Sequence, residues 1–110
     1  MQHSVTNWHV DRDHASEWEA ICEQMHELAC QTPGFLQARV LRSVEHPGKF
    51  VVYALWDSRE AWDAYYELPR MQALTHASFR LLKGPPIQEW FDVVADVIAE
   101  GVTPALPPSG

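Results

Sequence analysis

The stretch between residues 33 and 62 most constrains the fold, because it contains a predicted hairpin followed by the start of a helix. Residues 35–44 and 49–56 are rich in apolar and β-branched side chains and predict two strands. The sequence EHPG at 45–48 predicts a tight turn, since proline presets φ and glycine accepts a positive φ. So short a connection makes the two strands antiparallel neighbours. Residues 49–56, KFVVYALW, are apolar on both faces. We therefore expect helices on one face and a ligand, another sheet or a second subunit on the other.

Residues 14–30 change to a helical period. Their apolar side chains form one stripe of an amphipathic helix. The stripe comprises Trp18, Ile21, Cys22, Met25, Leu28 and Ala29. Ser16 and Glu19 match a capping box, and Asp13 is an alternative cap for an earlier start. The proline–glycine pair at 33–34 ends the helix before the hairpin.

The N-terminal residues predict another strand. Residues 3–10 are β-branched and aromatic, and charged residues 11–13 follow them. Alternation puts Val5, Asn7 and His9 on one face of this strand. The opposite face carries Ser4, Thr6, Trp8 and Val10.

The second half of the chain predicts two helices and one ambiguous segment. Asp57 and Ser58 are favourable N-caps for a helix that Pro69 interrupts, and a second helical segment runs from residue 70 to about residue 82. Residues 87–98 fit either a helical stripe or a strand. The element order is then β-α-β-β-α-α-β, or β-α-β-β-α-α-α if the last segment is a helix. The first order is the ferredoxin-like α+β arrangement, an antiparallel sheet with helices on one face only.

The length indicates one small domain, and the aromatic content indicates more apolar surface than its core can bury. The chain has 110 residues, and we expect a single domain over residues 1–98 and a flexible proline-rich tail over residues 99–110. Five Trp, three Tyr and four Phe are more than a core of this size easily hides. A subunit interface or an aromatic-lined pocket should cover the surplus.

The charge pattern excludes some partners. The net charge is −7, and the eight Lys and Arg residues are scattered, which argues against nucleic acid and anionic membranes. No signal peptide or membrane-spanning apolar run is visible. Cys22 and Cys30 on one helix would lie ~12 Å apart along its axis, too far for a disulfide. Free thiols indicate the cytoplasm.

Several polar side chains are candidates for chemistry. A neutral His9 could act as a general base, or it is an interface residue if its strand face packs on a partner. Asn7, on the same face, could orient O₂ or a substrate carbonyl, or satisfy a backbone group. His76 is either a ligand or a surface histidine. No zinc spacing, phosphate loop or Ser-His-Asp order is present, so no metal site is expected.

The three most distinctive segments together resemble the antibiotic biosynthesis monooxygenase (ABM) domain superfamily. They are PGFLQARVLRS at 33–43, KFVVYALWDSREAWDAYYELP at 49–69 and IQEWFDVV at 87–94, and the resemblance covers roughly residues 4–95. It implies a ferredoxin-like fold that dimerises sheet to sheet into a dimeric α/β barrel. That agrees with a third strand that is apolar on both faces. The resemblance also favours a strand for residues 87–95.

One branch of the superfamily implies an oxygenase activity. Its members oxidise anthrones, quinols and related polyketide aromatics with O₂ and no cofactor, because the substrate forms a stabilised carbanion that hands an electron to O₂ directly. An Asn and a Trp on the third strand and a Tyr on the next helix are implicated in that branch. Trp56 matches the Trp, whereas Val52 stands at the Asn position and Trp62 at the Tyr position. The resemblance thus implies an aromatic pocket around Trp56 that lacks the Asn.

A second branch degrades haem. It uses an Asn on the first strand, a Trp on the helix after the third strand and an iron-binding His on the following helix. Asn7 matches the Asn, and Tyr65 falls at the Trp position. The His position falls near residues 74–75, so His76 is the nearest histidine, and one residue along a helix is about 100° of rotation.

The sequence therefore predicts a homodimeric cytoplasmic monooxygenase that needs no cofactor and oxidises a small aromatic, quinol-like or polyketide-like substrate with O₂. We expect catalytic roles for Asn7, His9 and Trp56, and a substrate pocket lined by Trp62, Tyr65, His76 and Phe91. One alternative is a haem-degrading monooxygenase, with haem as its cofactor. Another is a non-catalytic small-molecule-binding or interaction module on the same fold.

Overall fold

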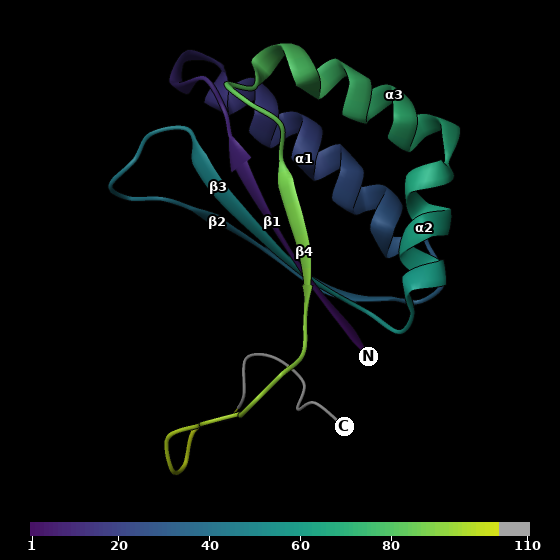
Figure 1. Cartoon of the computed structure of the whole chain (residues 1–110), viewed down its shortest axis with the longest axis vertical. Helices are drawn as coiled ribbons and strands as arrows, with labels where there is room; N and C mark the ends of the chain where they lie inside the picture. Colours follow the sequence, from purple (N-terminus) through teal and green to yellow (C-terminus); the bar gives the residue numbers. More distant parts are fainter. Residues whose placement is uncertain (104–110) are drawn as a thin grey trace.

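The computed structural model describes residues 1–103, in which a four-stranded antiparallel sheet carries helices on one face (Figure 1). The elements in chain order are β1 (Gln2–His9), η1 (Arg12–His14), α1 (Ala15–Cys30), β2 (Phe35–Arg42), β3 (Lys49–Trp56), α2 (Arg59–Glu67), α3 (Pro69–Ser78), η2 (Phe79–Leu81) and β4 (Ile87–Phe91). This order confirms the predicted ferredoxin-like α+β fold. The bounds of β3 agree with the predicted strand at both ends.

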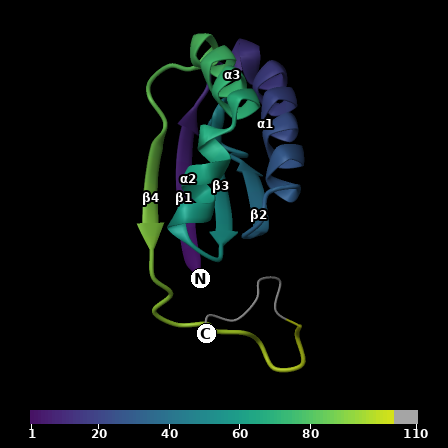
Figure 2. The ribbon, with the colours of Figure 1, turned by 90° about the vertical axis from the view of Figure 1, so that its right-hand side faces the viewer.

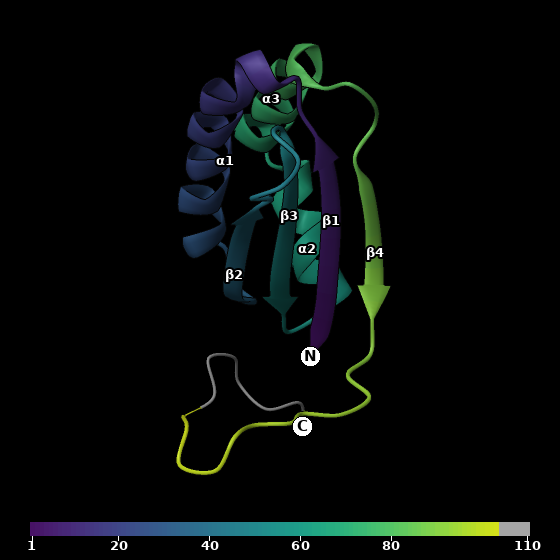
Figure 3. The same cartoon turned by 90° about the vertical axis from the view of Figure 1, so that its left-hand side faces the viewer.

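The sheet has the strand order β2-β3-β1-β4. All three helices cover the same face, which Figure 2 views from the helix side, and Figure 3 views the opposite, open face. The central pair is β1 and β3, whose register runs from Gln2 opposite Trp56 to His9 opposite Lys49. Side chains of a strand alternate between faces, so Thr6 and Trp8 point to the helices, whereas Asn7 and His9 belong to the open face.

A β-bulge corrects the predicted facing of Phe35. Strict alternation along β2 puts Phe35 on the face of Leu41, but the register shifts by one residue between Phe35 and Gln37. The extra residue, Leu36, is 49% exposed, and Phe35 pairs with Trp56 on the helix side. Their rings meet edge to face with centroids 5.1 Å apart. The bulge therefore transfers one aromatic side chain from the open face to the interior.

The helices pack as their apolar stripes predict, but one predicted cap is wrong. Trp18, Cys22, Met25 and Ala29 of α1 are buried, and the other two members of the stripe are half-buried. His14 occupies the N-cap of α1 and makes no side-chain cap bond, because η1 comes first and Asp11 caps it by accepting from the Asp13 N–H. The Ser58 hydroxyl caps α2 by accepting from the Ala61 N–H at 3.1 Å.

The last strand is shorter than predicted. A strand was expected over residues 87–95, but β4 ends at Phe91, and residues 92–95 form no strand. The reason lies in the register with β1, where Phe91 is opposite His3, so β1 offers almost no further partner. The chain then leaves the sheet as an extended segment (Figure 1). Residues 104–110, the end of the predicted tail, lie outside the described residues.

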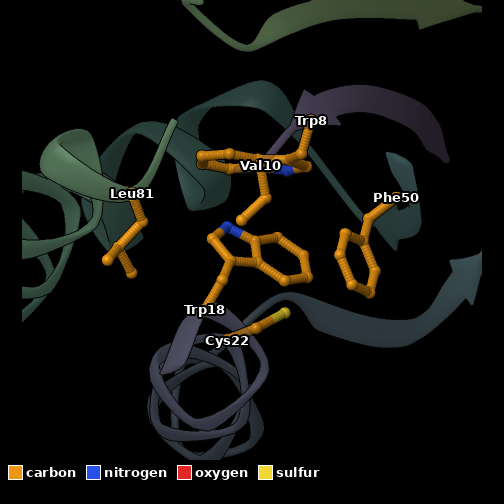
Figure 4. Close-up of a cluster of buried hydrophobic side chains, with 6 residues drawn as sticks. All are labelled: Trp8, Val10, Trp18, Cys22, Phe50 and Leu81. Atoms are coloured by element: carbon orange, nitrogen blue, oxygen red, sulfur yellow. The ribbon is translucent and has the colours of Figure 1, made fainter. Parts of the chain in front are cut away.

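The core between sheet and helices is built around Trp18. Its ring lies 4.3 Å from that of Phe50 and 5.5 Å from that of Trp8, centroid to centroid. Figure 4 shows it reaching from α1 into the space between these strand side chains and Leu81. Trp18 is 2% exposed, and full burial of a large apolar side chain contributes roughly 2–3 kcal/mol. A second buried cluster continues the core toward α2 and α3 and comprises Met25, Ala29, Trp56, Tyr65, Met71 and Leu74.

Gly48 lies in the β2–β3 turn, where the turn packs closely against the end of β1. Its φ is +88°, and a Cβ there would lie 2.1 Å from the carbonyl oxygen of Val10, whose N–H donates to Gly48 O at 2.8 Å. We expect Gly48→Ala to lower the free energy of unfolding in urea by at least about 2 kcal/mol, through backbone strain and loss of this contact. Gly84→Ala is the matched control, because a Cβ at Gly84 meets open space. Equal stability of the two variants would contradict this account of the turn.

Candidate functional site

An aromatic cleft opens between the sheet and the second half of the helical layer. Its volume is about 570 Å³. Strands β1 and β4, helices α2 and α3, and the connection from η2 to β4 all contribute to its wall. The lining residues are Thr6, Trp8, Trp62, Tyr66, Thr75, Phe79, Leu82, Lys83, Gly84, Pro85, Pro86 and Gln88. A concave, mostly apolar space with a few polar groups is the usual form of a small-molecule site.

A small inner cavity of about 40 Å³ adjoins the cleft. Thr6, Trp8, Trp62 and Tyr66 line both spaces, so they form the boundary between them. Deeper in, the inner cavity is lined by Trp56, Phe35, Val52 and His26, among others. A ligand in the cleft therefore faces a space at its inner end that is much smaller than the cleft.

A continuous series of ring contacts joins the inner cavity to the cleft. Trp56 meets Tyr65 at 5.1 Å between centroids, Tyr65 meets Tyr66 at 5.0 Å, and Tyr66 meets Trp62 at 4.6 Å. These distances fall in the range at which aromatic pairs attract one another beyond simple burial. The series fixes the ring orientations, so the wall of the site is rigid on the side of α2.

Two buried polar atoms in this region have no hydrogen-bond partner within the described residues. They are Nε1 of Trp56, a residue that lines the inner cavity, and Oγ1 of Thr75, a residue of the cleft wall. A buried donor without a partner costs about 1–3 kcal/mol, and native proteins rarely leave one. These atoms are therefore the natural partners for polar atoms of a bound ligand.

Three further polar side chains of the site, those of Tyr65, Tyr66 and Gln88, are engaged in hydrogen bonds or held neutral. The Tyr65 hydroxyl donates to the carbonyl oxygen of Met25 at 2.7 Å. Burial raises the pKa of Tyr66 to about 12 and raises that of Tyr65 further, so both phenols stay protonated near neutral pH. Gln88 donates to the Ser4 hydroxyl at 3.0 Å.

His26 is the titratable group of the inner cavity that remains able to accept a proton. Burial lowers its pKa below the usual histidine range, and a hydrogen bond with the backbone of Cys22 partly offsets this. The ring Nδ1 also lies 3.5 Å from the Cys22 sulfur. Burial raises the pKa of the Cys22 thiol to about 12, so the thiol is not a nucleophile at neutral pH. A neutral imidazole is thus available next to a buried, unreactive sulfur.

The structure brings together only part of the predicted site. Trp56, Trp62 and Tyr65 line the inner cavity, and Trp62 also lines the cleft. Asn7, His9 and Phe91 lie on the open face of the sheet, so Asn7 and His9 do not share a cavity with Trp56. His76 is exposed on α3 and is not among the residues that line the cleft.

Three site residues were not predicted from the sequence, and the signal that could have revealed them differs from one to the next. Thr6 follows from the strand alternation itself, because it lies next to Asn7 on the helix-facing side of β1. Thr75 is adjacent to His76 but on the inner side of α3. His26 lies on α1 beside the apolar stripe, with no local pattern that marks it. Its role in the cavity depends on packing, which a single sequence does not display.

The histidines of the site do not suit haem. His26 is the histidine that lines the inner cavity, and about 40 Å³ has no room for a porphyrin. Within residues 1–103, no three or more His, Cys, Asp or Glu side chains are grouped to hold a metal ion. None of the helices in the same residues is long and apolar enough to cross a lipid bilayer.

Comparison with known proteins places this site in a family. The profile of the family named antibiotic biosynthesis monooxygenase matches residues 1–77, which is most of the chain. The chain belongs to the antibiotic biosynthesis monooxygenase (ABM) family. This confirms the resemblance inferred from its sequence segments. No curated protein matches the sequence closely enough to refine the assignment.

Solved structures share the fold at low sequence identity. A protein from Nitrosomonas europaea, provisionally named an antibiotic biosynthesis monooxygenase, has a TM-score of 0.79 at 18% identity and covers 86% of this chain and 100% of its own. SnoaB from Streptomyces nogalater, a cofactor-independent oxygenase, has a TM-score of 0.77 at 18% identity, covering 87% of this chain and 95% of its own. A protein from Caulobacter crescentus with the same provisional name has a TM-score of 0.78 at 23% identity, and the match covers 86% of this chain and 90% of that protein.

The lowered pKa of His26 has a measurable consequence for stability. The unfolded chain takes up a proton at the usual histidine pKa near 6.5, whereas the folded chain does so only at lower pH. The folded state therefore loses stability as the pH falls below about 6.5. We expect the free energy of unfolding to fall less between pH 7.5 and pH 5.5 in His26→Gln than in the wild type. The exposed His76→Gln is the control and should follow the wild type. Parallel profiles for all three proteins would show that His26 is not buried as described.

Proposed function

We propose that this protein is a cofactor-independent monooxygenase that oxidises a fused-ring aromatic carrying a phenol or keto oxygen. The observation that carries the proposal is the buried Trp56 indole N–H, which has no partner within the described residues and belongs to a residue that lines the inner cavity beside the cleft of about 570 Å³. Such an arrangement suits a planar ligand with one oxygen that must be held in a dry site. Membership of the ABM family and the fold shared with SnoaB support the same reaction class.

The proposed reaction converts a ring methylene, activated by an oxygen across the ring, into a carbonyl. One oxygen atom of O₂ enters the substrate and the other leaves as water, taking both methylene hydrogens with it. The substrate itself supplies the electrons once it is deprotonated, so the protein has to bind, orient and deprotonate it and exclude water. The apolar, ring-lined wall of the site is suited to these tasks.

We assign separate roles to three side chains. The Trp56 N–H donates to the substrate oxygen on which negative charge develops, and a fixed donor of this kind typically contributes a factor of about 10²–10³ to the rate. The Thr75 hydroxyl, at the cleft wall, is a second hydrogen-bond partner for the substrate. Neutral His26 accepts the substrate proton. Trp62 and Tyr65 pack around the ring system, as the sequence predicted for the substrate pocket.

The open face of the sheet supports the second part of the proposal, a homodimer. Leu41, Ile87 and Phe91 are 48–54% exposed on this face. Val51 and Tyr53 lie between them on β3. Exposed apolar side chains on three strands of one face support an interaction site, and the antiparallel sheet of a second copy is a matching surface. Asn7 and Phe91 then belong to the interface rather than to the catalytic site. The two free thiols suit the reducing cytoplasm in which we place the dimer.

The activity is tested by O₂ consumption with a panel of anthrone substrates, without added flavin or metal. We expect enzyme-dependent O₂ uptake and a loss of about 100-fold in kcat/KM in Trp56→Phe, which keeps the ring packing and removes the donor. Trp90→Phe is the matched control, because Trp90 contacts the Trp62 ring but is not among the residues that line the cleft or the inner cavity. Absence of uptake across the substrate panel would refute the oxygenase. Equal losses in both variants would refute the role of Trp56.

The dimer is tested by sedimentation velocity at micromolar concentration. We expect twice the monomer mass for the wild type and a shift to monomer for Ile87→Glu, since a buried unpaired charge within an apolar interface is costly. Val44→Glu is the control, because Val44 is 99% exposed in the β2–β3 connection. A wild-type monomer would contradict the sheet-to-sheet arrangement.

A further inference from the structure

A third pocket, in addition to the cleft and the inner cavity, lies at the end of the sheet where the β2–β3 turn is. Its volume is about 290 Å³, and its lining residues are His9, Val10, His46, Pro47, Gly48, Lys49 and Lys83. Every titratable side chain in this set is basic. The whole chain carries a net charge of −7, and Lys49 and Lys83 are the only lysines in its sequence. Both lysines of this acidic protein therefore line the same pocket.

The strand register places three of these residues in a row. His9 of β1 is opposite Lys49 of β3. On the other side of β1, an antiparallel bridge joins Val10 to Leu82, and the Lys83 N–H donates to the His9 carbonyl oxygen at 2.7 Å. Lys83, His9 and Lys49 therefore lie side by side across three adjacent segments. The turn adds His46, whose carbonyl oxygen accepts from the Lys49 N–H at 3.1 Å.

Lys49 and Lys83 bring two ammonium groups to the same pocket. Two positive charges that line one small pocket repel each other, and an anion between them would remove this repulsion. The ion pairs of the described residues involve other basic groups, namely His14, Arg42 and Arg80. The nearby carboxylate of Asp11 accepts from the Asp13 N–H instead. Within residues 1–103, no ion pair joins a carboxylate to either of these lysines.

We propose that this pocket binds an oxyanion, a carboxylate or phosphate group. Lysine ammonium groups are compact charges with three donors each, and two of them with two imidazoles can surround a small anion from several sides. Lys83 also lines the aromatic cleft, so the anion is either free phosphate or the acidic group of a ligand whose rings lie in the cleft. The oxyanion site itself does not depend on the proposed oxygenase activity.

Because the chain has only two lysines, the site can be tested on the unmodified protein. An amine-acetylating reagent is applied for short times, and mass spectrometry follows Lys49, Lys83 and the Met1 amine separately. The ionic strength is held constant with sodium chloride while 10 mM phosphate is added. For a dissociation constant of about 1 mM, we expect acetylation of both lysines to slow by about tenfold. The Met1 amine is the internal control and should be unaffected.

A second arm distinguishes the source of the anion. It compares 2-naphthoate with 2-naphthalenemethanol, which shares the rings and lacks the charge. Protection by phosphate alone supports a free-phosphate site, and protection by naphthoate but not by the alcohol supports an anchor for an acidic cleft ligand. In Lys49→Gln, the remaining Lys83 should lose the protection, whereas Arg70→Gln, on the exposed surface of α3, should keep it.

Three results would overturn the oxyanion site. One is that no anion slows the acetylation of the lysines. Another is that Met1 is protected to the same extent, which indicates a bulk salt effect. The third is protection that rises with protein concentration in the absence of added anion, which would show that the row pairs with a second copy of the chain.

Discussion

The antiparallel pairing of β1 with β3 is the constraint on which the rest of the molecule depends. Its register runs without interruption from Gln2 opposite Trp56 to His9 opposite Lys49. Because side chains alternate strictly along both strands, this register assigns each one to the core or to the open face. Slippage by one residue would exchange the two faces completely, and Trp18 would lose Trp8 and Phe50 as packing partners. The core, the cleft and the exposed apolar face all follow from this one pairing.

Much of the fold could be predicted because it depends on local patterns. The apolar run of β3, the turn at Gly48 and the stripe of α1 are periodic features that short-range physics controls. The end of β4 could not be predicted in the same way, since the apolar residues after Phe91 favour a strand locally. What stops the strand is the lack of a partner beyond His3 on β1, which is a property of the register and not of the segment.

The candidate site was less accessible to sequence reasoning. Trp56, Trp62 and Tyr65 can be predicted as pocket residues, because large rings cluster in the sequence where β3 ends and α2 begins. Asn7 is a candidate both for its polar side chain and for its match to related proteins, whereas strand alternation places its neighbour Thr6 at the cavity. His26 belongs to a helix whose pattern explains the apolar residues around it. Only the packing of α1 against the sheet brings its ring to the inner cavity.

The bulge at Leu36 shows how such a fold can change its pocket without changing its frame. One additional residue in β2 turns Phe35 inward, while the pairing from Gln37 onward remains regular. The insertion or deletion of a single residue at the edge of a sheet can therefore change the face to which a neighbouring side chain points. Relatives with nearly the same backbone can differ at this position in the residue that reaches the cavity. Comparison of such proteins should therefore align them by strand register before it compares their residues.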